Sequence, residues 1–164
     1  MRYWLKFGHS MAAMALLGSL AALLVVYQQL PVPADNLEVY AQLRGAMERI
    51  TTLVTLPSLV ASIVLGLLSM AFVSGFHNAP WAWAKLLTGV LMLEGSLLGI
   101  QGPIQREATR ALAAMSDLAW VEQLGSTVIA EQRSIWAVGA VATVNVILGV
   151  WRPRFSARAA TPSF

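Results

Sequence analysis

Long apolar runs are the feature that most restricts how this chain can fold. Of its 164 residues, 57% are hydrophobic and only 12% are charged. A soluble domain usually carries about twice that charged fraction. A run of about 20 apolar residues can cross the hydrocarbon core of a bilayer as a helix. Four such runs predict an all-α fold, in which residues 1–155 form one bundle of four transmembrane helices and residues 156–164 form a disordered tail.

Aromatic, proline and glycine residues mark the ends of the four predicted spans. Tyr and Trp concentrate at membrane interfaces, and Pro and Gly interrupt helices. The spans are expected to cover residues 3–27, 51–76, 81–100 and 134–151. Pro57 lies inside the second span and should kink it. Gly102 and Pro103 should end the third.

Two charged segments flank these spans and also contain apolar residues at helical spacing. Residues 37–50 repeat apolar side chains every three or four positions, so they should lead directly into the second span. Residues 104–133 contain seven charged side chains and are therefore not embedded. Their apolar positions predict amphipathic helices that lie on or near the membrane surface between the third and fourth spans.

The distribution of basic residues predicts the orientation in the membrane. One side carries only basic residues near the helix ends, and the other carries five arginines together with seven acids. Because positive charge concentrates on the cytoplasmic side, both termini should be cytoplasmic, with the chain in a bacterial inner membrane. The residues on that side are Arg2, Lys6, Lys85, Arg152, Arg154 and Arg158.

The basic residues form no continuous stripe, which argues against nucleic acid as a partner despite a net charge of +3. The expected partners are the lipid bilayer and either other membrane proteins or further copies of the chain. The sequence has no cysteine, which excludes disulfides, thiol nucleophiles and iron–sulfur clusters. It also lacks a Walker loop, a GxSxG motif and an HExxH motif.

Few polar residues remain as candidates for chemistry. His9 lies about two turns into the first span, where a histidine suggests a function. The alternative is a neutral imidazole bonded to a backbone carbonyl or a serine. Lys85, near the same membrane face, either extends toward the interface or meets a ligand together with His9. His77, in the turn after the second span, is either a solvated loop residue or a ligand.

A second group of polar residues lies deeper in the membrane. Glu94 is the only acid inside a predicted span, near the midplane, with Ser62 and Asn145 at similar depth. A carboxyl there must pair, face water or be protonated. The three residues therefore predict either a hydrogen-bonded layer that joins helices or a proton relay. Gly95 and Gly99 form a GxxxG pair that allows close helix approach.

Several segments resemble motifs of one known family in order and spacing. They are Trp4-Leu5-Lys6-Phe7-Gly8-His9, Met47-Glu48-Arg49 with Thr55-Leu56-Pro57-Ser58 and Gly66, Trp81 to Lys85, and Val146 to Pro153. Together they resemble the HemJ-type protoporphyrinogen IX oxidases. The family's L-P-R-x-F-V-Y-H segment and its Asn-Glu-Pro are absent. The chain also resembles a related family of integral membrane proteins of unknown function that shares L-K-x-x-H.

The resemblance implies a four-helix membrane bundle that binds haem b, with His9 and Lys85 as its essential residues. We therefore expect a haem-b-binding membrane protein engaged in electron transfer or tetrapyrrole oxidation, with His9 as the iron ligand and Lys85 or His77 as a further cofactor-binding residue. One alternative is a non-enzymatic subunit or stabiliser of a larger membrane complex. Another is a proton-coupled carrier that uses Glu94.

Overall fold

The computed structural model describes residues 2–72 and 80–151, and within these ranges every regular element is helical. The predicted all-α fold is therefore confirmed. In order, the elements are α1 (Arg2–Gln28), α2 (Leu37–Ile50), η1 (Thr51–Thr55), α3 (Leu56–Phe72), α4 (Pro80–Ser96), η3 (Leu97–Gln101), α5 (Gly102–Ala114), η4 (Leu118–Gln123) and α6 (Val128–Trp151). The predicted tail and the end of the second span, 73–76, lie outside the described residues.

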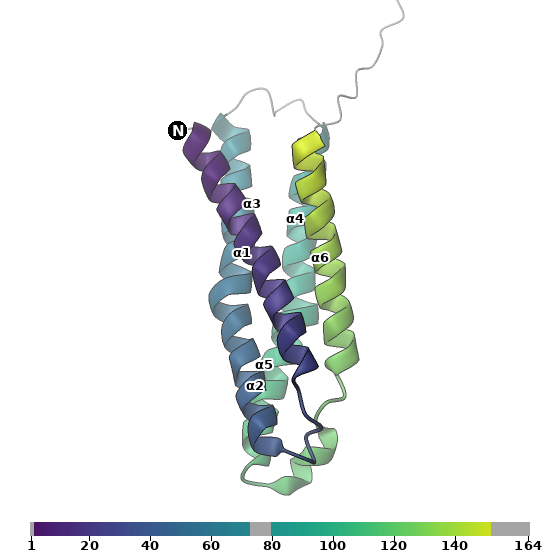
Figure 1. Cartoon of the computed structure of the whole chain (residues 1–164). Coiled ribbons are helices and arrows are strands. Elements are labelled where there is room, and N and C mark those ends of the chain that lie inside the picture. The colour runs from purple at the N-terminus through teal and green to yellow at the C-terminus, as the bar shows by residue number, and fades with distance from the viewer. Residues whose placement is uncertain (1, 73–79, 152–164) are drawn as a thin grey trace, which may run out of the picture.

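The longest helices run alongside one another. Figure 1 shows α1, α3, α4 and α6 side by side, with α2 and α5 at the end of the bundle away from the N-terminus. Among the described residues, three helical stretches are long and apolar enough to cross a membrane: Tyr3–Gln28, Leu37–Phe72 and Ala82–Ala114. These stretches contain the first three predicted spans, as far as those spans are described.

Pro57 and Pro103 each lie in a helical stretch that continues past the proline. The turns at η1 and η3 are π-helical, so the N–H of Leu56 bonds to Thr51 O and that of Gly102 bonds to Leu97 O. Each wide turn ends two residues before a proline, Pro57 or Pro103. A proline has no N–H and its ring crowds the carbonyl four residues earlier. In a π-turn each N–H bonds to the carbonyl five residues earlier instead of four, which shifts the backbone hydrogen bonds by one residue before the proline.

The expected stop at Gly102-Pro103 was therefore wrong, because helix runs from α4 through η3 into α5. The segment after Pro103 was expected to form amphipathic helices on or near the membrane surface. In the structure α5 packs against α2, and the two helices extend the bundle beyond α3 and α4 (Figure 1). The face of α5 that becomes buried contains Ile104, Glu107, Ala108, Ala111 and Ala114.

The main apolar core fills the bundle on the α2 and α5 side and extends to about the middle of α1. Its fully buried members include Leu23, Met47, Leu59, Ile100 and Ile135. A smaller apolar cluster between α2, α5 and η4 closes the end of the bundle. Toward the N-terminus of α1 the tight packing ends, and a cavity begins.

The GxxxG pair packs α4 against α6 within one chain. A Cβ at Gly95 would lie 3.7 Å from Val138 Cγ2, and one at Gly99 would lie 2.7 Å from Ser134 Oγ. The second distance is too short for a real contact. Gly99→Ala should therefore destabilise the fold by about 1–3 kcal/mol through overpacking, measured by thermal unfolding in detergent.

Gly18→Ala is the matched control, because a Cβ there meets nothing within 4 Å. In a helix this exchange should be neutral or slightly stabilising. Ser134→Gly should restore stability to the Gly99→Ala protein, since it removes both atoms that obstruct the new methyl group. Equal stability of Gly99→Ala and Gly18→Ala would contradict the close approach of α4 and α6.

Candidate functional site

A cavity of about 510 Å³ lies between α1, α3, α4 and α6 in the half of the bundle nearest the N-terminus. Its volume falls within the range of about 300–1,000 Å³ typical of cofactor and small-molecule sites. Most of the wall is apolar, with Leu16, Leu59 and Met92 among its members. The polar residues that line it are Lys6, His9, Ser10, Ser62, Ser69, Lys85 and Asn145.

His9 is held by α3. Its Nδ1 lies 2.9 Å from the Ser62 carbonyl oxygen and 3.3 Å from Ser62 Oγ. A carbonyl oxygen can only accept a hydrogen bond, so Nδ1 carries the proton and donates it. In the neutral imidazole the lone pair is then on Nε2. The bond to a carbonyl or serine, which was the alternative to a functional role, is therefore present. Metal-ligating histidines are held by the same kind of bond through their other ring nitrogen, so the contact is compatible with both interpretations.

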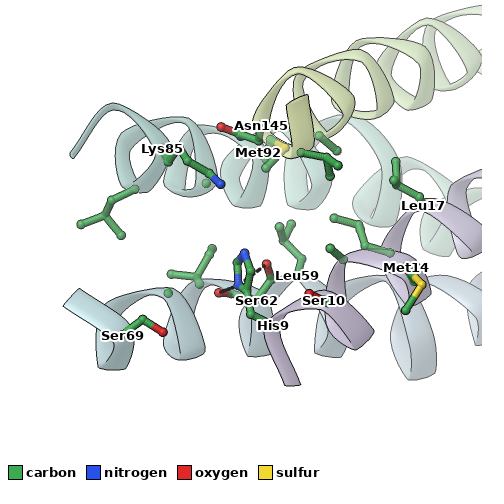
Figure 2. Close-up of a pocket in the computed structure, with 18 of the residues that line it drawn as sticks. His9, Ser10, Met14, Leu17, Leu59, Ser62, Ser69, Lys85, Met92 and Asn145 are labelled. Atoms are coloured by element: carbon green, nitrogen blue, oxygen red, sulfur yellow. Dashed lines mark hydrogen bonds between the residues drawn. The ribbon is translucent and has the colours of Figure 1, made fainter. Parts of the chain in front are cut away.

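Lys85 faces His9 from the opposite wall. Figure 2 shows the Lys85 side chain, from α4, and the His9 ring, from α1, pointing toward one another across the cavity. Lys85 is half-buried, and the exposed Lys6 also lines the cavity. No acidic side chain lines it among the described residues. The polar part of the site is therefore cationic, which favours a ligand that carries negative charge.

Gly66 leaves room beside the histidine. A Cβ at Gly66 would lie 4.0 Å from His9 Cε1. Gly89, on the facing wall, instead lets α4 approach α3, since a Cβ there would lie 3.4 Å from Ile63 Cγ1. An apolar space with a histidine on one wall and a lysine on the other suits an apolar molecule that carries an anionic group.

The structure does not bring the three predicted midplane residues together. Asn145 accepts a hydrogen bond of 2.9 Å from Thr88 Oγ1, and Ser62 contacts His9. Glu94 is exposed on the outside of α4. The layer that was to join Glu94 to Ser62 and Asn145 is therefore absent. Asn145 lies level with Thr88, six residues before Glu94 on α4, and Gly95 packs against Val138, seven residues before Asn145 on α6. The three residues therefore do not share one level of the bundle. His77, a candidate ligand, lies outside the described residues.

A buried polar cluster at the opposite end of the bundle was missed from the sequence. Arg44, Glu107 and Glu131 are 0%, 1% and 0% exposed. Arg44 Nη1 donates to Glu131 Oε2 over 2.6 Å, and its Nη2 lies 4.0 Å from Glu107 Oε1. One guanidinium thus meets two carboxylates, on three helices far apart in sequence.

Two tyrosine hydroxyls and a further N–H of the guanidinium complete this cluster. Tyr27 donates to Glu131, Tyr40 donates to Glu107 over 2.7 Å, and Arg44 Nε donates to the Tyr40 oxygen over 3.1 Å. The Arg44 guanidinium also lies over both tyrosine rings, 5.5 Å and 5.3 Å from their centroids. The cluster therefore ties α1, α2, α5 and α6 together.

A sequence signal for this cluster existed. Arg44 lies four residues after Tyr40 and three before Met47, so it shares their helix face, and all three are buried. Glu107 likewise falls in phase with Ile104 and Ala111. A charged residue in register with an apolar face indicates a buried ion pair, whereas the number of charges predicted only that these segments lie outside the membrane.

The chain matches no protein-family model, no curated protein and no solved structure. The resemblance to the HemJ-type oxidases therefore stays a prediction that depends on the motifs quoted above.

Proposed function

We propose that this chain is a haem-b-binding integral membrane protein that acts in electron transfer or tetrapyrrole oxidation. The observation that carries the proposal is the cavity wall at His9, where a neutral imidazole is fixed through Nδ1 and its Nε2 is left for a metal. Histidine is a common axial ligand of haem iron. When bound, haem supplies one-electron chemistry, while the chain binds and orients it.

The lining of the cavity supports haem through its polarity and charge. Its apolar wall would cover the macrocycle, and Gly66 leaves space beside the imidazole. The propionates of haem are carboxylates, and Lys6 and Lys85 supply the positive charge that would hold them. In an alternative role, a neutral Lys85 amine would be a second ligand of the iron.

The same proposal includes four spans in a bacterial inner membrane. We infer that α6 is the fourth span, because it runs beside α1 and α4 and has Trp136 and Trp151 near its ends. Both termini would be cytoplasmic. His9 would then lie about 7–8 Å below the aromatic belt at Trp4, at a rise of about 1.5 Å per residue. Haem would therefore bind in the cytoplasmic half of the membrane.

The absorption spectrum of the purified protein tests the function. Expressed in a bacterium that makes haem b and purified in mild detergent, the protein should show a Soret band, with resolved α and β bands on reduction. A protein that stays colourless, and gains no such bands when haemin is added, would contradict the proposal.

Substitution of Lys85 separates its two proposed roles. If the amine binds iron, Lys85→Ala should shift the band positions, because an axial ligand sets the electronic state of the haem. If the ammonium pairs with a propionate, Lys85→Ala should lower haem occupancy and leave the bands in place, and Lys85→Arg should restore occupancy. Lys85→Ala protein with unchanged bands and full occupancy would exclude both roles.

A further inference from the structure

One face of α4 carries a carboxyl at membrane depth on the outside of the bundle. Glu94 lies eleven residues beyond Trp83, or about 16 Å along a helix. Trp83 is 55% exposed and marks the membrane interface. Glu94 is itself exposed on α4, so it faces neither the cavity nor a described neighbour that could pair with it. A carboxyl in hydrocarbon is strongly disfavoured unless a partner satisfies it.

The residues around Glu94 have the spacing of a helix–helix seam. Ala84, Leu87, Leu91, Glu94 and Leu98 follow one another at intervals of three, four, three and four, and all five are exposed. We call them the Glu94 stripe. This heptad spacing keeps side chains on one face toward a partner helix, and one polar residue within such a seam fixes its register. Lipid by itself requires no such polar residue.

Membrane helices often associate through a GxxxG face, but in this chain that face already contacts α6. Gly95 and Gly99 lie against Val138 and Ser134 of that helix, and both glycines are half-buried. The Glu94 stripe is a different face of α4, and it is still exposed. An association between chains would therefore use the stripe and not the glycine pair.

We propose that two copies of this chain associate in the membrane through the Glu94 stripe, with their Glu94 carboxyls hydrogen-bonded to each other. A neutral carboxyl is both a donor and an acceptor, so it is complementary to its own copy. Two chains inserted in the same orientation and related by a two-fold axis bring identical residues together at the same depth. A cationic partner would require two charges to be buried, which is less favourable.

Cysteine cross-linking tests this interface, because the chain contains no cysteine. Leu87→Cys, Leu91→Cys and Leu98→Cys should each form a reducible dimer in native membranes treated with copper phenanthroline. Val144→Cys on α6 and Leu67→Cys on α3 are matched controls at exposed apolar positions. We expect several-fold more dimer from the stripe than from the controls. Equal yields, no dimer, or adducts only with a protein of another mass would overturn the proposal.

Glu94 variants test the carboxyl pair itself. In detergent, Glu94→Leu should lower the dimer association constant by about tenfold, since it removes interhelical hydrogen bonds in an apolar environment. Glu94→Gln keeps a donor and an acceptor and should change the constant by less than about threefold. An unchanged haem spectrum in both variants would show that the fold is intact. Dimers equally stable with Glu, Gln and Leu would refute the pairing.

Discussion

His9→Ala should abolish haem binding, the largest functional effect we expect from any single substitution. The imidazole supplies the only histidine nitrogen that lines the cavity among the described residues. Alanine leaves the apolar wall intact but removes the metal ligand, so a haem that still entered would lack the bond from His9 to its iron. The measurement is the ratio of Soret absorbance to protein absorbance after purification, which should fall to background.

Ser62→Ala is the control for this experiment. The stronger contact of His9 is to the Ser62 backbone carbonyl, at 2.9 Å, and alanine retains that carbonyl. The variant loses only the hydroxyl contact at 3.3 Å, so it should keep its haem with unchanged bands. Full haem occupancy with unaltered bands in His9→Ala would refute the ligand assignment and make His77 the next candidate.

Arg44→Ala should destabilise the protein by about 3–5 kcal/mol, because it leaves buried carboxylates without their cation. Arg44, Glu107 and Glu131 are each at most 1% exposed. Water therefore cannot replace the lost guanidinium without opening the packing between α2, α5 and α6. Thermal unfolding in detergent, monitored by circular dichroism, measures the change.

Arg49→Ala is a matched control on the same helix, because Arg49 is exposed. Its loss should change stability by less than about 0.5 kcal/mol. Arg44→Lys should restore only part of the stability, because one ammonium cannot reproduce the separate bonds from Nε to Tyr40 and from Nη1 to Glu131. If Arg44→Ala were as stable as Arg49→Ala, the cluster would contribute nothing to the fold.

The sequence by itself determined the helical fold. Apolar runs of sufficient length can satisfy their backbone in lipid only as helices, so the class followed from composition and run length. Depth follows from a constant rise along each helix. For this reason His9 was correctly expected near the same membrane face as Lys85, and the structure brings both to one cavity.

Only the tertiary structure decided which faces meet. Glu94 and Asn145 were expected to pair, yet Glu94 is exposed and Asn145 bonds to Thr88. Conversely, Arg44 and Glu131 were expected in two separate segments outside the membrane, with no contact foreseen between them, and they are buried together. In membrane helices the lipid-facing and protein-facing sides are both apolar, so hydrophobic periodicity cannot tell them apart. In the apolar spans the rotation of each helix is set by side-chain packing against its neighbours. In α2 and α5, by contrast, the charged residues in phase with the apolar face already indicated which side is buried.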